Sequence, residues 1–189
     1  MRIAFTDGEM SNLQADFGQL LCACLVEYRP PTKSRPSPWA GLRTFTLHDY
    51  HGKRYDDKRL AVQWRDAMKE YDIIVTWNGI RFDLPFLNTR LQQWGEKEFV
   101  PAIHKDLMYT ARYKLRLASS SLESVSNYLD ICARYAVAKT KMEPRQWVRA
   151  LGGDEKSYRY IIHHCQQDVK VLAAIWQETK RLVTNLGAK

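Results

Sequence analysis

The sequence is short of cysteine and has no long hydrophobic run, and both shortages limit what the protein can be. Its four cysteines, at positions 22, 24, 132 and 165, form neither a disulfide scaffold nor a paired C-x-x-C zinc pattern. We therefore expect a reducing, cytoplasmic compartment. No stretch approaches the roughly 18 apolar residues of a membrane span. Asp7 and Glu9 interrupt the apolar run that begins at Ile3, so we expect neither a signal peptide nor a membrane partner.

Acidic residues are also in the minority, because 29 Lys and Arg stand against 21 Asp and Glu and the formal net charge is +8. A basic balance favours a polyanionic partner such as nucleic acid, although charge alone is equally consistent with simple solubility. The 189 residues, 45% of them hydrophobic, correspond to one ordinary globular domain, which we expect to span 1–189.

The spacing of apolar residues predicts an α/β protein. Strands are expected at 2–9, 18–28, 42–48, 73–77 and 104–109. Helices are expected at 58–71, at 83–94 and from Ser121 to about Val183, with breaks near Thr140 and at Gly152-Gly153. We expect the first three strands to be antiparallel and the later ones, which follow helices, to be parallel. This order predicts a mixed β-sheet flanked by helices.

Two carboxylates in the first strand form the first candidate site. Side chains two residues apart in a strand point to the same face, so Asp7 and Glu9 are expected to lie side by side. Two like charges this close need a cation between them. The alternative interpretation is a polar strand end beside a turn, and spacing alone does not separate the two.

The second candidate segment is N-G-I-R-F-D at 78–83, directly after the strand predicted at 73–77. Asn-Gly favours a turn, and Asp83 falls where the next helix begins, a position suited to helix capping. The loop after a strand of an open α/β sheet is also where functional sites gather. Asp83 can therefore be a helix cap, a functional carboxylate, or both.

The third candidate segment is H-H-C-Q-Q-D-V at 163–169, within a long helix predicted from about Asp154 to Val183. A buried stripe is predicted at 161, 165, 169, 172 and 175, and Asp168 lies at its border. A carboxylate there needs an ion pair or a metal ion, so either a salt bridge or a functional role is expected. His164 lies on the side of Asp168, one turn earlier, whereas His163 falls on the polar side.

Together the three segments resemble the DEDD-type 3′-5′ exonucleases of the ribonuclease H-like superfamily, whose motifs are D-x-E, N-G-x-x-F-D and a helical Asp preceded by Tyr or His. The matching residues here are Asp7-x-Glu9, Asn78-Gly-x-x-Phe82-Asp83 and His164-x-x-x-Asp168. The second and third segments look most like the proofreading exonuclease domain of family B DNA polymerases and its stand-alone relatives. The resemblance covers nearly the whole chain.

The resemblance implies a ribonuclease H-like fold and a metal-dependent 3′-5′ exonuclease. Its substrate would be the end of a single-stranded nucleic acid, with DNA favoured over RNA, and its partners would include replication or repair proteins. Two Mg²⁺ or Mn²⁺ ions would act at the scissile phosphate, with Asp7 bridging them. The implied metal ligands are Asp7, Glu9, Asp83 and Asp168.

The resemblance also implies a general base and substrate contacts. The polymerase-like branch has Tyr where this chain has His164, and the other branch has His one residue earlier, which would select His163. A continuous helix would bring only His164 to Asp168, so His164 is the predicted base and His163 the alternative. Asn78 and Phe82 would contact the terminal nucleotides, although a core position is an equal alternative for Phe82.

A basic run is the last candidate, because Arg112, Lys114 and Arg116 alternate with Tyr113 and Leu115. An extended segment would place the three cations on one side, where they could follow a phosphate backbone. A helix would spread them around its surface, and a solvated basic face is the commoner meaning of such a run.

Two other functions stay open at this point. One is a nuclease of the same fold with endonucleolytic or RNA-directed activity, since a fold does not determine a reaction. The other is a catalytically silent nucleic-acid-binding module. Four acidic residues facing a polyanion argue against the binding module.

Overall fold

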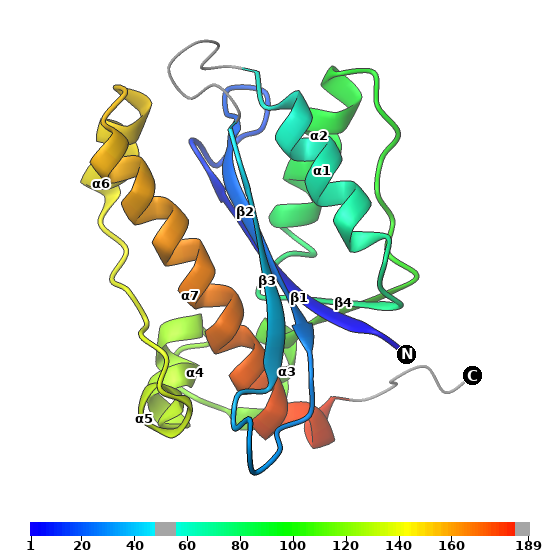
Figure 1. Ribbon diagram of the computed structural model, residues 1–189, viewed down its shortest axis with the longest axis vertical. Helices are drawn as coiled ribbons and strands as arrows, with labels where there is room; N and C mark the ends of the chain where they lie inside the picture. The colour runs from blue at the N-terminus through cyan, green and yellow to red at the C-terminus, as the bar shows by residue number, and fades with distance from the viewer. Residues whose placement is uncertain (48–55, 184–189) are drawn as a thin grey trace.

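A five-stranded mixed sheet with helices on both faces forms the centre of the protein (Figure 1). The structure is a computed structural model and describes residues 1–47 and 56–183. Its strands are β1 (Ile3–Met10), β2 (Leu20–Tyr28), β3 (Trp39–Thr46), β4 (Ile73–Thr76) and β5 (Ile103–Asp106), in the spatial order β3-β2-β1-β4-β5. β1, β2 and β3 pair antiparallel, whereas β4 and β5 continue the sheet in parallel. The predicted mixed sheet is confirmed.

The helices connect and cover these strands. They are α1 (Lys58–Met68), α2 (Asp83–Gln93), α3 (Leu107–Thr110), α4 (Leu122–Tyr128), α5 (Ile131–Tyr135), α6 (Pro144–Leu151) and α7 (Glu155–Thr179). A π-helical turn, η1 (Ala111–Leu115), follows α3, and a 3-10 turn, η2 (Lys180–Leu182), follows α7. Within residues 1–47 and 56–183, no helix is both long and apolar enough to cross a membrane.

All five strands differ from their predicted bounds by a few residues, and two of them differ by three residues at one end. The strand expected at 104–109 ends at Asp106, because the carboxylate of this residue accepts a hydrogen bond from Met108 N and caps α3. The strand expected at 42–48 begins at Trp39 and ends at Thr46, and residue 48 lies outside the described residues.

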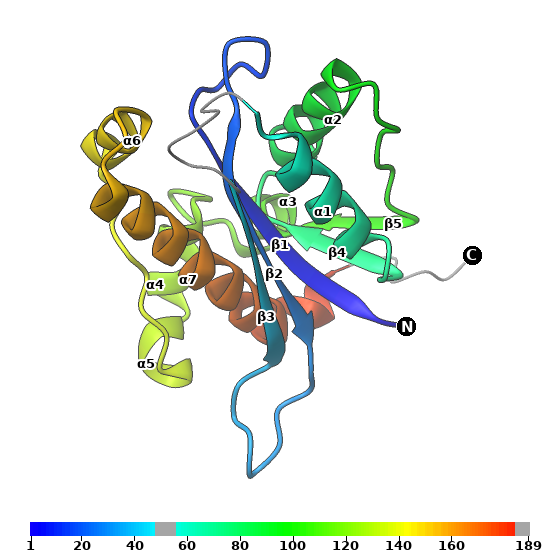
Figure 2. The ribbon, with the colours of Figure 1, turned by 45° about the horizontal axis from the view of Figure 1, so that its top comes forward.

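The alternation of side chains along β1 decides which residues face α7. Thr6 and Gly8 face α1, where Trp64 Nε1 donates to Thr6 Oγ1 over 2.7 Å. A Cβ on Gly8 would lie 2.7 Å from the Trp64 ring, so only glycine allows this contact. Phe5 packs on Trp176 of α7 with ring centroids 6.0 Å apart. Asp7 and Glu9 share the parity of Phe5 and therefore face α7, which crosses that side of the sheet in Figure 2.

α7 runs without a break through the third candidate segment. Asp154 begins the helix by accepting hydrogen bonds from the backbone N–H groups of Lys156 and Ser157. The predicted buried stripe is confirmed, since each of its five residues is at most 1% exposed: Ile161, Cys165, Val169, Leu172 and Ile175. The side chains of residues 164 and 168 consequently lie on one side of the helix, toward β1.

Candidate active site

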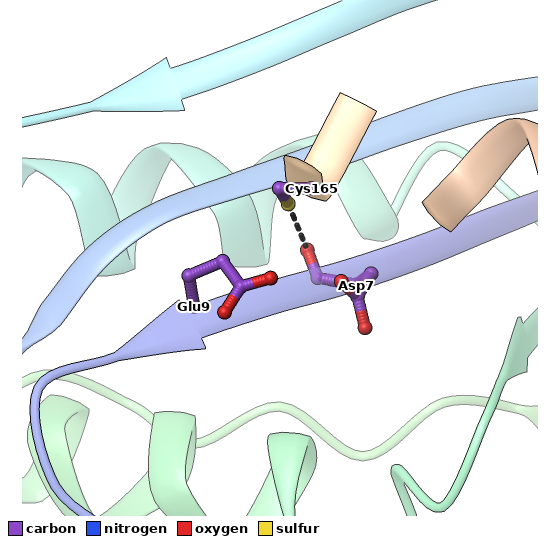
Figure 3. A group of neighbouring side chains, drawn as sticks. All are labelled: Asp7, Glu9 and Cys165. Carbon is purple, nitrogen blue, oxygen red and sulfur yellow. Dashed lines mark hydrogen bonds between the residues drawn. The ribbon is translucent and has the colours of Figure 1, made fainter. Parts of the chain in front are cut away.

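Four carboxylates from three elements gather where α7 crosses β1. Asp7 and Glu9 come from β1, Asp83 from the first turn of α2, and Asp168 from α7. Figure 3 shows Asp7 and Glu9 side by side on β1. β1 continues to Met10, so Asp7 lies within this central strand. Asp83 and Asp168 are 3% and 8% exposed, which makes the cluster a largely desolvated acidic centre.

Asp83 reaches the cluster through a contact between distant parts of the chain. Its Oδ1 accepts a hydrogen bond from the backbone N–H of Gly8 over 3.1 Å, directly between Asp7 and Glu9. Phe82, not Asp83, occupies the N-cap position of α2, and Phe82 makes no side-chain capping bond. The capping interpretation of Asp83 is therefore wrong. Asp106 performs the local task, because it accepts hydrogen bonds from Asn78 N at 2.8 Å and Ile80 N at 3.2 Å and so holds the turn before α2.

The negative charge of the carboxylates is poorly stabilised, because the side chains are buried and lie close to one another. Burial, followed by repulsion from neighbouring carboxylates, raises the pKa of both Asp7 and Glu9 well above the usual range. Burial raises the pKa of Asp83 to about 7, against the lowering effect of the Gly8 hydrogen bond. A cluster of buried oxygen ligands with raised pKa values suits hard divalent cations such as Mg²⁺ or Mn²⁺.

His164 lies among these carboxylates and His163 does not. The Nε2 atom of His164 is 3.6 Å from Asp168 Oδ2 and 3.9 Å from Glu9 Oε1. The His164 side chain is buried, and burial lowers its pKa, with Asp168 acting in the opposite direction. His163 is exposed on the other side of α7.

Two residues that the sequence did not single out hold the His164 ring. Thr140 Oγ1 lies 2.6 Å from Nδ1 of His164, within hydrogen-bond distance. Trp147 of α6 packs edge-on against the ring, with centroids 5.6 Å apart and an interplanar angle of 85°. The only sequence signal for this support was the predicted break near Thr140, which becomes the irregular connection between α5 and α6.

Lys139 is the site residue that the sequence analysis missed altogether. Its Nζ lies 2.6 Å from both carboxylate oxygens of Asp168, and the two side chains are only 15% and 11% exposed. The ion pair that was one expected role for Asp168 therefore exists, and it lies inside the acidic cluster. One lysine among 29 basic residues, in no motif, offers no sequence signal of such a contact.

A buried thiol lies directly beside the carboxylates. Cys165 Sγ donates to the backbone oxygen of Asp7 over 3.5 Å (Figure 3). The ligand atoms of Asp7, Glu9 and Cys165 all lie within 4.8 Å of one another. Burial raises the pKa of the Cys165 thiol well above its usual range. Sulfur is a poor ligand for Mg²⁺, so the oxygen atoms are the relevant donors for a hard cation.

The predicted substrate contacts, Asn78 and Phe82, lie in the turn that leads into α2, and Phe82 directly precedes Asp83. Asn78 has a left-handed backbone, with φ of 65°, and its carbonyl accepts from Arg81 N and Phe82 N. The half-buried Phe82 packs on Phe86 with centroids 6.0 Å apart, and it also lines a cavity of about 290 Å³. Phe82 thus combines a core contact with access to the surface.

The basic run does not form the extended segment that a shared face requires. Arg112 and Lys114 belong to the π-helical turn η1, and Arg116 ends it with a left-handed backbone. All three are exposed, but a helical turn directs alternate side chains to different sides. The condition for three cations on one face is therefore not met, and the other interpretation of the run, a solvated basic surface, is favoured.

Comparison with known proteins adds three findings. The sequence profile of the RNase H superfamily matches residues 39–179, which include Asp83 and Asp168. A DNA polymerase of Methanocaldococcus jannaschii is 26% identical over 136 residues, which cover 61% of this chain and 8% of that protein. The family B DNA polymerase of the hyperthermophilic archaeon Pyrobaculum calidifontis superposes with a TM-score of 0.70 at 16% identity, over 95% of this chain and 24% of that one. The chain thus spans only a small part of either polymerase.

Proposed function

The chain belongs to the RNase H superfamily, as its motifs predicted, and on this basis we propose that it is a metal-dependent 3′-5′ exonuclease. Its substrate would be the end of a single-stranded nucleic acid, with DNA preferred over RNA. One observation carries the proposal: four carboxylates, a histidine and a lysine meet at a single desolvated centre. The raised pKa values of Asp7, Glu9 and Asp83 are typical of a functional site, because burying carboxylates beside one another costs folding free energy.

The carboxylates would hold the metal ions. Two Mg²⁺ or Mn²⁺ ions, when bound, would neutralise the charge of the scissile phosphate and make a bound water acidic. Asp7 and Glu9 would contribute oxygen atoms from β1 (Figure 3) and Asp168 from α7, while Gly8 N donates to the carboxylate of Asp83. A divalent charge would reverse the repulsion that raises the pKa values, so the donor set fits such ions.

His164 would accept the proton of the attacking water at Nε2. With Nδ1–H donating to Thr140 Oγ1, Nε2 keeps its lone pair and faces Glu9 and Asp168. A lowered pKa leaves the ring neutral at pH 7, as a proton acceptor must be. Trp147 restricts the ring on its other side and limits its rotation.

The relatives support nucleic acid as the substrate. Both similar proteins are DNA polymerases, which favours DNA, although this chain matches only a small part of each. Phe82, beside its surface cavity, would contact an unpaired base, and Asn78 would contact the terminal nucleotide. Arg112, Lys114 and Arg116 would act only as a diffuse attraction for phosphates.

Digestion of end-labelled strands tests the proposal. Single-stranded DNA and RNA of equal sequence, each labelled at the 5′ end, are incubated with the protein in Mg²⁺, in Ca²⁺ and in EDTA. We expect a ladder that shortens from the 3′ end in Mg²⁺, faster for DNA, no hydrolysis in EDTA, and binding without cleavage in Ca²⁺. Asp7→Ala and Asp168→Ala should lower turnover by orders of magnitude, while Glu98→Ala, an exposed control, should not.

Each other function predicts a different result in the same digest. Internal fragments from the start would indicate an endonuclease, and faster loss of RNA would indicate an RNA-directed enzyme. Tight binding without hydrolysis in Mg²⁺ or Mn²⁺ would indicate a binding module. Undiminished cleavage in excess EDTA would refute the metal mechanism.

A further inference from the structure

One buried tryptophan contacts β1 from the face opposite Asp7. Trp64 of α1 is fully buried, and its Nε1 donates to Thr6 Oγ1 over 2.7 Å. The six-membered part of its ring packs on Gly8, since a Cβ on Gly8 would lie 2.7 Å from Cη2 and 3.1 Å from Cζ3 of the ring. Thr6 and Gly8 directly precede and follow Asp7. Trp64 therefore contacts the two positions of the strand that enclose this carboxylate.

Both contacts of Trp64 are made in the core. The Thr6 hydroxyl, which accepts from Trp64, donates to the backbone oxygen of Cys24 on β2 over 2.8 Å. Thr6, Cys24 and Trp64 are all fully buried, so these two hydrogen bonds are shielded from water. At Gly8 the ring fills the space that a side chain would occupy, so a movement of either one would open a gap or cause a clash. These contacts hold β1 in one position relative to α1.

The position of Gly8 matters at the candidate active site because its backbone N–H reaches Asp83. Gly8 N donates to Asp83 Oδ1 over 3.1 Å, and Asp83 is 3% exposed. Asp7 and Glu9, on either side of Gly8 in the sequence, point to the other face of the strand. A shift of the β1 backbone at Gly8 would therefore move Asp7 and Glu9 and stretch the hydrogen bond to Asp83 at the same time.

We propose that Trp64 is a positioning residue for the metal ligands, because it holds β1 where Asp7, Glu9 and Asp83 can share a metal ion. Trp64 would touch neither metal nor substrate, since α1 lies on the opposite side of β1 from α7 (Figure 2). The inference rests on the proposed function and deepens it, because these carboxylates are the ones that would bind the ions. Residues that orient metal ligands typically contribute roughly 10- to 100-fold to metal affinity.

Binding of Mn²⁺ to Trp64→Phe tests the proposal without any substrate. Phe keeps an aromatic ring in the core but lacks the indole N–H and part of the ring that packs on Gly8. We expect the Kd for Mn²⁺, measured by isothermal titration calorimetry, to rise roughly tenfold. Trp94→Phe is the matched control, because it also removes an indole hydrogen bond, which Trp94 Nε1 donates to Asp57 over 2.7 Å. This control should keep the parental Kd even with a lower Tm.

A second pair of variants tests the contact at Gly8. Gly8→Ala places a methyl group against the Trp64 ring and should raise the Kd for Mn²⁺ by at least the same factor. In Gly8→Ala/Trp64→Phe the smaller ring leaves room for that methyl group, so the double variant should bind Mn²⁺ more tightly than Gly8→Ala does. Two unconnected losses would instead add, and the double variant would bind most weakly. Gly8→Ala alone carries the test if Trp64→Phe fails to fold.

Hydrogen exchange followed by NMR separates this proposal from the proposed function, because it needs no metal. In Trp64→Phe the Gly8 amide should exchange roughly tenfold faster relative to the amide of Val26, a buried residue of β2, since the hydrogen bond to Asp83 weakens. If the parent binds Mn²⁺, an unchanged Kd in Trp64→Phe, or an equal rise in Trp94→Phe, overturns the positioning role even if the protein is an exonuclease. A parent that binds no Mn²⁺ refutes the metal-dependent function. The exchange ratio then decides whether Trp64 holds the carboxylates, and an unchanged ratio overturns that role.

Discussion

Replacing Asp83 by Asn should stabilise the metal-free protein, and the gain should grow with pH. Asp83 is buried beside other carboxylates, and burial raises its pKa to about 7 from an ordinary value of 3.8. Asn has the same shape, and its Oδ1 can still accept the hydrogen bond from Gly8 N. The substitution therefore removes the ionisation of this side chain and preserves its contact.

The sign and size follow from proton linkage. A carboxyl group with a raised pKa holds its proton in the folded protein and releases it on unfolding, so folded stability falls as pH rises from about 4 to about 7. The loss is about 1.4 kcal/mol for each unit of pH within this window. Between pH 5 and pH 7 the parent should therefore lose roughly 2 kcal/mol that the Asn variant keeps. For a protein of this length, that corresponds to about 4 to 8 °C in Tm.

Thermal unfolding in EDTA, followed by circular dichroism at pH 5, 6, 7 and 8, measures the effect. Glu98→Gln, which removes an exposed carboxylate, is the control and should track the parent at every pH. Adding Mg²⁺ at pH 8 should stabilise the parent more than Asp83→Asn, because the proposed metal ions need the charged carboxylate. A difference between Asp83→Asn and parent that does not change with pH would show that the raised pKa is wrong.

The remaining predictions concern the other site residues. His164→Ala should lower turnover by about 10² to 10⁴, His163→Ala should not, and His164→Tyr should recover part of the rate. A single-turnover assay measures these rates. If His163→Ala proves slow and His164→Ala does not, the role of general base belongs to His163. Lys139→Met should destabilise the metal-free protein by roughly 1 to 3 kcal/mol, because a buried carboxylate loses its ion pair, and saturating Mg²⁺ should restore most of it in thermal unfolding. Neutralising Arg112 and Lys114 together should flatten the salt dependence of DNA binding only slightly, since the two do not share a face; a large change in slope would show that both contact phosphates.

Local periodicity predicted the parts of the site that lie within one strand or helix. A period of two placed Asp7 and Glu9 on one face of β1, and the buried stripe of α7 placed His164 beside Asp168. These relations need only a regular backbone. The choice between His163 and His164 required one further fact, the continuity of α7, because a break would have rotated the residues before Asp168.

Contacts between distant residues were beyond such reasoning. Its position at a helix start left Asp83 open as a cap, a functional carboxylate or both, yet its partner is Gly8, 75 residues away, and Asp106 holds the turn instead. Position in a helix predicts which local bonds a side chain can make, but tertiary contacts decide which one it makes. The resemblance to known exonucleases supplied Asp83 as a site residue where spacing could not.

Lys139 shows that the partner of the Asp168 carboxylate depends on whether a metal ion is bound, as well as on the fold. Its ammonium group lies 2.6 Å from both oxygens of Asp168, so in the metal-free protein it supplies the positive charge that the carboxylate needs. A divalent cation bound by Asp168 must share those oxygens with Lys139 or displace it. Lys139 lies between α5 and α6, in a segment without helix or strand, where a side chain can move without breaking backbone hydrogen bonds. The ion pair with Lys139 therefore accounts for the buried Asp168 in the metal-free protein. It also leaves this carboxylate available to a metal ion.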